Sequence, residues 1–224
     1  MRRALHALLA LTAALLPAPA LADVTARYTF RDAKIVIEAA DNGNSRVDID
    51  GKHRLWIIRR DGIDYVVLRD SDGEEHAALA EGAFARLLGP APPAAQAVDA
   101  VMGGPDSVAG YSGTVWQFGP RGETPIELLM SPDPRLAPIG AVCLRLVEPI
   151  FGRYFDREAL RKLFAAGTPL RIGPAGLPAE QLILFESASF DPVDPKRFAV
   201  PGPLIPAADL ADLLAPPPVD VIVD

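Results

Sequence analysis

The sequence predicts an α+β protein built on an antiparallel β-sheet with a few short helices. Over much of the chain after residue 23, apolar and polar residues alternate with a period of two, as in strands that bury one face. Turns rich in Asn, Asp and Gly divide this pattern into short strands about every ten residues, which leaves no room for the helical crossovers of a parallel sheet. Helical periodicity is confined to a few short segments later in the chain.

The first 22 residues are typical of a cleavable secretory signal peptide. Arg2 and Arg3 provide a positive end, an apolar run covers residues 4–16, and Ala-Leu-Ala precedes residue 23 with the small residues that signal peptidase requires. The alternative is a membrane anchor, but a helix that spans a bilayer needs about 20 apolar residues. We therefore expect cleavage after Ala22, a periplasmic location and a mature chain with no integral membrane segment.

The first half of the mature chain is expected to fold as a meander of hairpins. The turn at residues 41–44 reads Asp-Asn-Gly-Asn, and these residue types tolerate the positive φ of tight hairpin turns. The strands predicted here cover residues 24–31, 35–39, 46–50, 55–58 and 65–68.

The second half is expected to mix helices with further strands. A helix over residues 79–88 carries Leu79, Ala83 and Leu87 on one face and ends at Gly89. The other predicted elements are one or two helical turns at 95–102, strands at 108–118 and 126–130, helices at 139–147 and 157–166, and strands at 169–172 and 182–190. We expect one domain over residues 23–205, followed by a proline-rich tail over residues 206–224.

Composition excludes some classes of partner. The net charge of −7 becomes two units more negative once Arg2 and Arg3 are removed, so the chain lacks the basic surface of a nucleic-acid-binding protein. The single cysteine, Cys143, cannot form an internal disulfide and lies in an apolar stretch. A small buried side chain is the simpler interpretation, and a reactive thiol or an intermolecular bridge is the alternative.

Motifs for metals and cofactors are weak. The mature chain retains His53 and His76, and no His-x-x-His or Cys-x-x-Cys spacing accompanies them, so we expect solvated histidines and no metal. Residues 70–74, Asp-Ser-Asp-Gly-Glu, partly match a calcium-binding loop, but the acidic spacing favours a hairpin turn. Gly103-Gly104 lacks the spacing of a phosphate-binding loop, so no cofactor is expected.

A hydrolase is the least favoured class of function. Residues 110–114, Gly-Tyr-Ser-Gly-Thr, approach the nucleophile-elbow motif, but Thr114 replaces the last glycine and Ser112 falls within a predicted strand. A serine hydrolase would need His53 or His76 to lie within hydrogen-bond reach of a serine and a carboxylate.

The order of parts resembles that of the half-barrel superfamily of periplasmic lipoprotein carriers, the LolA, LolB and RseB type, and in particular an exported bacterial branch of it. The resemblance rests on VTARYTFRDAKIVIEAADNGNSRVDI, DYVVLRDSDGEE, VAGYSGTVWQF and ESASFDPVDPKRFAVP. It implies a curved sheet, a LolA-like half-barrel, with short helices over its concave face. In carriers that face holds acyl chains, whereas RseB-like members bind proteins. LolB is anchored through a cysteine, and here Asp23 follows the leader.

Large apolar side chains on the predicted strands are the candidates for a ligand lining. They face either a cavity or a closed core, and the sequence leaves both possibilities open. The candidates are Trp56, Tyr111, Trp116, Phe118, Met130 and Phe185. We expect a non-enzymatic periplasmic protein that binds a lipid, an acyl chain or a lipidated segment. The alternative is a module of the envelope that binds a protein partner and has no ligand cavity.

Overall fold

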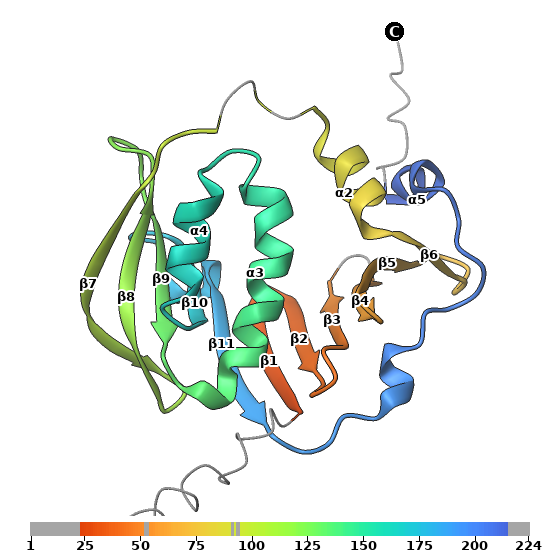
Figure 1. The fold of residues 1–224 in the computed structure, drawn as a ribbon, viewed down its shortest axis with the longest axis horizontal. Coiled ribbons are helices and arrows are strands. Elements are labelled where there is room, and N and C mark those ends of the chain that lie inside the picture. Colours follow the sequence, from red (N-terminus) through yellow and green to blue (C-terminus); the bar gives the residue numbers. More distant parts are fainter. Residues whose placement is uncertain (1–22, 52–53, 91, 93–94, 215–224) are drawn as a thin grey trace, which may run out of the picture.

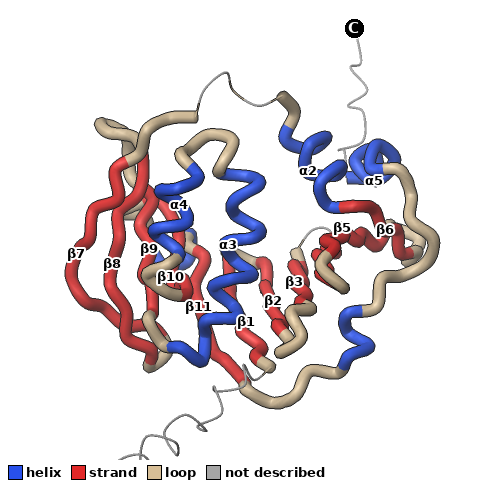
Figure 2. Tube along the Cα trace, viewed as in Figure 1, coloured by secondary structure: helices blue, strands red, loops and turns tan. Residues whose placement is uncertain are grey.

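The computed structural model describes residues 23–51, 54–90, 92 and 95–214. These residues form an α+β fold with one open, curved sheet of 11 antiparallel strands (Figures 1 and 2). The strand order is β6-β5-β4-β3-β2-β1-β11-β10-β9-β8-β7. The predicted fold class is therefore confirmed: the sheet is antiparallel, curved and not closed. The predicted leader lies outside the described residues.

The first half of the chain forms six consecutive hairpin-linked strands. Their turns place Gly43, Gly62 and Gly73 at φ values of 83°, 83° and 87°, a region that favours glycine. The strands are β1 (Val24–Phe30), β2 (Ala33–Ala39), β3 (Ser45–Asp50), β4 (Arg54–Arg60), β5 (Ile63–Arg69) and β6 (Glu75–Leu79). The predicted meander is thus confirmed for β1 to β5, and β6 is a further strand that was not predicted.

The second half completes the other side of the sheet. Its strands are β7 (Asp99–Val108), β8 (Tyr111–Gly119), β9 (Ile126–Ser131), β10 (Thr168–Pro174) and β11 (Ile183–Ser189). Because β11 pairs with β1, the last strand joins the first at the centre of the sheet. The prediction of helical turns at 95–102 is wrong, since strand β7 begins there and is hydrogen-bonded to β8. The strand predicted at 108–118 begins only after a turn in which Ala109 and Gly110 have positive φ.

In the described part of the chain, four α-helices accompany the sheet, and Figure 1 shows α3 lying across its inner face. They are α2 (Ala80–Leu88), α3 (Ala137–Phe151), α4 (Arg157–Phe164) and α5 (Ala207–Leu214). Short 3₁₀ turns are η1 (Pro134–Leu136), η2 (Ala179–Gln181) and η3 (Pro195–Phe198). The Asp156 carboxylate caps α4, because it accepts a 2.9 Å hydrogen bond from the Glu158 amide.

The main core lies between the sheet and the helix pair α3–α4. Gly140 lets α3 approach β10 closely, since a Cβ there would lie 2.8 Å from the Thr168 hydroxyl oxygen. Within this core, the Tyr28 hydroxyl donates a 3.0 Å hydrogen bond to the Pro169 carbonyl, which satisfies both buried groups. The largest fully buried core side chains include Phe118, Phe185, Leu129, Met130, Leu136, Ile139, Leu163 and Leu170.

A smaller cluster covers the opposite face of the sheet. Trp56 and Ile58 point to this face and pack with Phe198 of η3, whereas Ile57 between them points to the main core. Strand β4 is therefore buried on both faces, which explains its continuous apolar run.

The two edge strands of the sheet, β6 and β7, differ in what pairs with them. At β6, the backbone of the segment before α5 adds a short parallel pairing, with the Ile205 amide donating to the Ala77 carbonyl at 2.8 Å. At β7, nearly every residue is exposed, and the pairing with β8 shifts register between Met102 and Pro105. Among the described residues, no strand pairs with the outer edge of β7.

Candidate functional site

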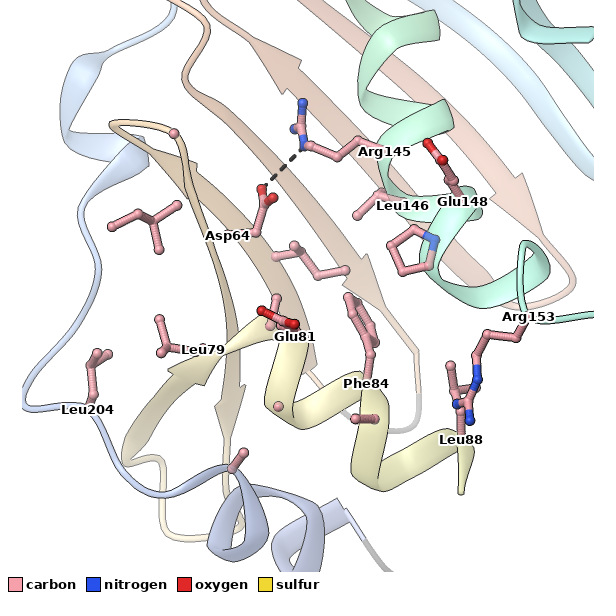
Figure 3. A pocket seen from close by; sticks show the side chains of 18 of the residues that line it. Asp64, Leu79, Glu81, Phe84, Leu88, Arg145, Leu146, Glu148, Arg153 and Leu204 are labelled. Carbon is pink, nitrogen blue, oxygen red and sulfur yellow. Dashed lines mark ion pairs between the residues drawn. The ribbon is translucent and has the colours of Figure 1, made fainter. Parts of the chain in front are cut away.

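A large groove opens on the helical face of the sheet, between α2 and α5 on one side and the C-terminal half of α3 on the other (Figure 3). Strands β4 and β5 form its floor, and its volume is about 1480 Å³. Large apolar side chains line it: Ile57, Ile63, Leu79, Phe84, Leu88, Leu146 and Leu204.

The groove exists because α2 packs toward α5 and not toward α3. Helix α2 starts directly at the end of β6, at the edge of the sheet, while α3 contacts β1, β2 and β10 at its centre. Gly82 allows the close approach of α5, since a Cβ there would lie 2.9 Å from the Ala207 Cβ. The α2 residues that are buried, Ala80 and Ala83, are too small to fill the space beside them.

Three of the aliphatic side chains in the groove are about half exposed. Ile63 has a relative exposure of 47%, Leu79 of 50% and Leu204 of 48%. They belong to three different segments of the chain, and all three line the groove. Concentrated apolar surface of this kind marks a binding site more often than isolated exposed residues do.

An ion network fixes one wall of the groove. The Asp64 carboxylate lies 2.7 Å from Arg59 Nη1 and 3.2 Å from Arg145 Nε, and Arg145 also donates to the Ser45 hydroxyl (Figure 3). Burial lowers the pKa of Arg145, and the neighbouring Asp64 partly opposes this shift. The network ties α3 to β5 and β3, so it holds the helix in place beside the groove.

The end of the groove near Gly89 carries further arginines. Arg153 donates to the Gly89 carbonyl, which links α2 to the segment after α3. Arg157 donates a 3.3 Å hydrogen bond from Nε to the Gly152 carbonyl. Glu148, which also lines the groove, is paired with Arg161.

The six residues predicted to line a ligand site lie elsewhere. Phe118, Met130 and Phe185 are buried in the main core, and Tyr111 and Trp116 pack against that core half-buried. Trp56 belongs to the cluster on the opposite face. None of the six lines the groove, and their contact with a ligand stays a prediction.

Aromatic packing accounts for several of these positions. The Phe185 ring makes edge-to-face contacts with Tyr28 and Tyr111, at centroid distances of 5.4 Å and 5.2 Å. The Trp56 ring lies beneath two guanidinium groups, those of Arg46 at 5.0 Å and Arg69 at 5.5 Å. Such contacts stabilise a folded core and its surface.

Of the residues considered for hydrolysis, the two that the structure describes, Ser112 and His76, are not brought together. Ser112 is exposed on β8, and His76 lies on β6, near the other edge of the sheet. His53 lies outside the described residues.

The hairpin turn predicted at residues 70–74 is confirmed, and it contains a small polar cluster. Asp70 Oδ1 accepts 2.9 Å hydrogen bonds from the amides of Asp72 and Glu74, and Asp70 Oδ2 lies 2.8 Å from His76 Nε2. The hydrogen bond with His76 lowers the pKa of Asp70. Asp70, Glu74 and His76 offer ligand atoms within 4.8 Å of one another, but a metal would have to displace the Asp70–His76 hydrogen bond.

The single thiol is buried, as the simpler interpretation of the sequence predicted. Cys143 lies on α3 within the main core, and burial raises its pKa to about 12. In the described part of the chain, no helix has the length and apolar character needed to cross a membrane.

No protein-family model matches the chain, and no curated protein matches it either. The groove itself therefore carries the functional argument.

Proposed function

We propose that this protein is a non-enzymatic binding protein for a lipid or acyl chain and that the groove between α2 and α3 is its binding site. The observation that carries the proposal is a groove of about 1480 Å³ in which large aliphatic side chains are left half exposed. Ligand sites for small molecules usually occupy about 300–1,000 Å³, so this one has room for an elongated apolar ligand.

Burial of apolar surface would supply the affinity. Each Å² of apolar surface removed from water contributes about 25 cal/mol, and both the ligand chain and the groove would lose water on binding. Among the described residues, the lining contains no cysteine, serine or histidine, and two of its three carboxylates, Asp64 and Glu148, are paired with arginines. Binding without chemistry fits this lining.

The predicted signal peptide supports a periplasmic location, and the resemblance to half-barrel carriers supports an acyl-chain ligand. An exported carrier would take up its ligand in the periplasm, where apolar chains must be shielded from water during transfer. The resemblance to half-barrel carriers points to the same class of ligand, since acyl chains bind on the helical face of their sheet.

A binding experiment tests the proposal. The mature protein is titrated with a neutral fluorescent probe, a pyrene-labelled long-chain alcohol, and lipids that copurify from the periplasm are identified by native mass spectrometry. We expect saturable binding that is weakened at least about tenfold by Leu79→Asp, because the charge must be desolvated in the apolar groove. Leu79 is the N-cap residue of α2 and makes no side-chain cap, so Asp at this position is compatible with the fold.

Leu87→Asp is the matched control. Leu87 lies on the same helix with a similar exposure of 46%, but it does not line the groove. We expect this variant to bind the probe as the unmodified protein does. Absence of saturable binding together with absence of copurified lipid would contradict the proposal, as would equal effects of the two substitutions.

A further inference from the structure

We propose that the ligand is an anionic amphiphile, a single apolar chain with a carboxylate or phosphate head, and that the head lies at the Arg153–Arg157 end of the groove. This inference rests on the proposed function and specifies its ligand. It follows from the unequal distribution of charge along the groove.

The two ends of the groove differ in chemistry. In Figure 3, Arg153 reaches toward Leu88 at one end, whereas Leu79 and Leu204 lie at the other. Ile63 adds a third half-exposed aliphatic side chain to the lining. A ligand that is apolar throughout would offer no polar group to the arginines at one end of the groove.

Two guanidinium groups at the polar end lack a carboxylate partner. Among the described residues, Arg153 and Arg157 form no salt bridge, and their hydrogen bonds go to the neutral carbonyls of Gly89 and Gly152. The other arginine of the lining, Arg145, is instead paired with Asp64. Each guanidinium has five N–H donors, so both Arg153 and Arg157 retain donors for a ligand.

The position of Glu81 sets the direction of the ligand. Glu81 lines the groove in the first turn of α2 and forms no salt bridge among the described residues. It is separated from Leu88 by seven residues of helix, about 10 Å at 1.5 Å per residue. An anionic head is repelled near Glu81 and attracted near Arg153, so the chain runs from the arginine end toward Leu79.

Arginine is suited to such a head. Its planar guanidinium binds carboxylate and phosphate oxygens in pairs, and it loses less hydration energy than an ammonium group does. Gly152 helps to place the second arginine, because a Cβ at this position would lie only 2.8 Å from Arg157 Cγ. The chain as a whole carries a net charge of −7, so general attraction would not hold an anion here.

Competition between matched ligands tests the inference. Oleate, oleyl phosphate and neutral oleyl alcohol, which share one chain, displace the pyrene-labelled alcohol from the mature protein below their micelle concentrations. We expect both anions to bind at least about tenfold more tightly than the alcohol, since hydrogen bonds to charged groups are among the stronger polar contacts. In the double variant Arg153→Gln/Arg157→Gln, the anions should lose this advantage over the alcohol.

A charge-matched control distinguishes binding at Arg153 and Arg157 from an effect of the protein's net charge. Arg86 and Arg121 are exposed and do not line the groove, so Arg86→Gln/Arg121→Gln removes the same charge elsewhere. This control should keep the preference for anions, and Arg153→Lys/Arg157→Lys should keep part of it. Circular dichroism and thermal unfolding check that each variant is folded.

The outcomes distinguish the two proposals. Equal binding of the alcohol and both anions, or an equal loss of preference in the control, overturns the anionic head but leaves the apolar groove as a binding site. Failure of all three compounds and of the probe itself to bind overturns the proposed function.

Discussion

The regions on either side of α3 lie on the same sheet but are packed very differently. On the side of β9 and β10, α4 follows α3 closely and buries Leu160, Leu163 and Phe164, so the space is filled. On the side of β4 and β5, α2 presents small alanines and packs toward α5, so a groove remains. Small side chains and the placement of one helix, not an absence of apolar residues, create the hollow region.

The largest expected effect lies in the filled region. We expect Phe185→Ala to lower the free energy of unfolding by about 3–5 kcal/mol, because a fully buried ring would leave a cavity. Phe84→Ala, in the wall of the groove, should cost less than about 2 kcal/mol, since its ring is only half buried. Urea unfolding of both variants measures the contrast, and equal losses would mean that the two regions are packed alike.

The thiol of the filled region should be almost inert in the folded protein. Burial raises the pKa of Cys143 to about 12 from the value of 9.0 for an ordinary thiol, so its thiolate fraction near pH 8 falls by about a thousandfold. Iodoacetamide labelling should therefore be slow in buffer and fast in urea. The stabilisation from the neutral thiol is complete below pH 9 and is lost as the pH rises through 12, so stability should fall in that window. Rapid labelling of the folded protein would show that this region opens.

The ion pair of Asp64 and Arg145, between the two regions, should contribute less to the free energy of unfolding than the buried Phe185 ring does. We expect Arg145→Met to lower the free energy of unfolding by about 1–2 kcal/mol, because Asp64 keeps Arg59 as a partner and both side chains of the pair retain some exposure. A double-mutant cycle with Asp64→Asn measures the coupling. A coupling near zero would show that the pair does not hold α3 in place.

The smallest effect is expected in the groove itself. Leu79→Ala should change the free energy of unfolding by less than about 0.5 kcal/mol, because half of the side chain is already in water. Thermal and urea unfolding check this value. A cost above 2 kcal/mol would mean that Leu79 is packed, and that the groove is narrower than described.

The strands were predictable because the physics that specifies them is local. Alternation of apolar and polar residues and the glycines at positive φ are enough to define the meander from β1 to β5. The error at 95–102 has a local cause: Val98, Val101 and Met102 follow a helical spacing, yet they lie before and within an edge strand that pairs with the next strand of the chain, β8.

The groove was not predictable from the same patterns. Periodicity placed Leu79 and Leu87 on a buried helix face, but both are about half exposed, and Leu79 is the last residue of β6 and precedes α2. Large aromatic residues such as Phe118 suggested a ligand lining, and the structure places them in or against its two apolar clusters. A groove forms where elements that are distant in sequence leave a space between them. The sequence of no single segment specifies that space.

Strand β7 forms one edge of the open sheet, and its features oppose the addition of a further strand from another molecule. An exposed strand edge is a template on which a second molecule can add, as in amyloid-like ribbons. Here Pro105 offers no amide proton, the irregular register beside it interrupts a straight ladder, and Arg171 together with the Ser107 amide keeps the pKa of Asp106 low. A neighbouring copy would meet a bent, charged border, so this rim resists aggregation at high protein concentration.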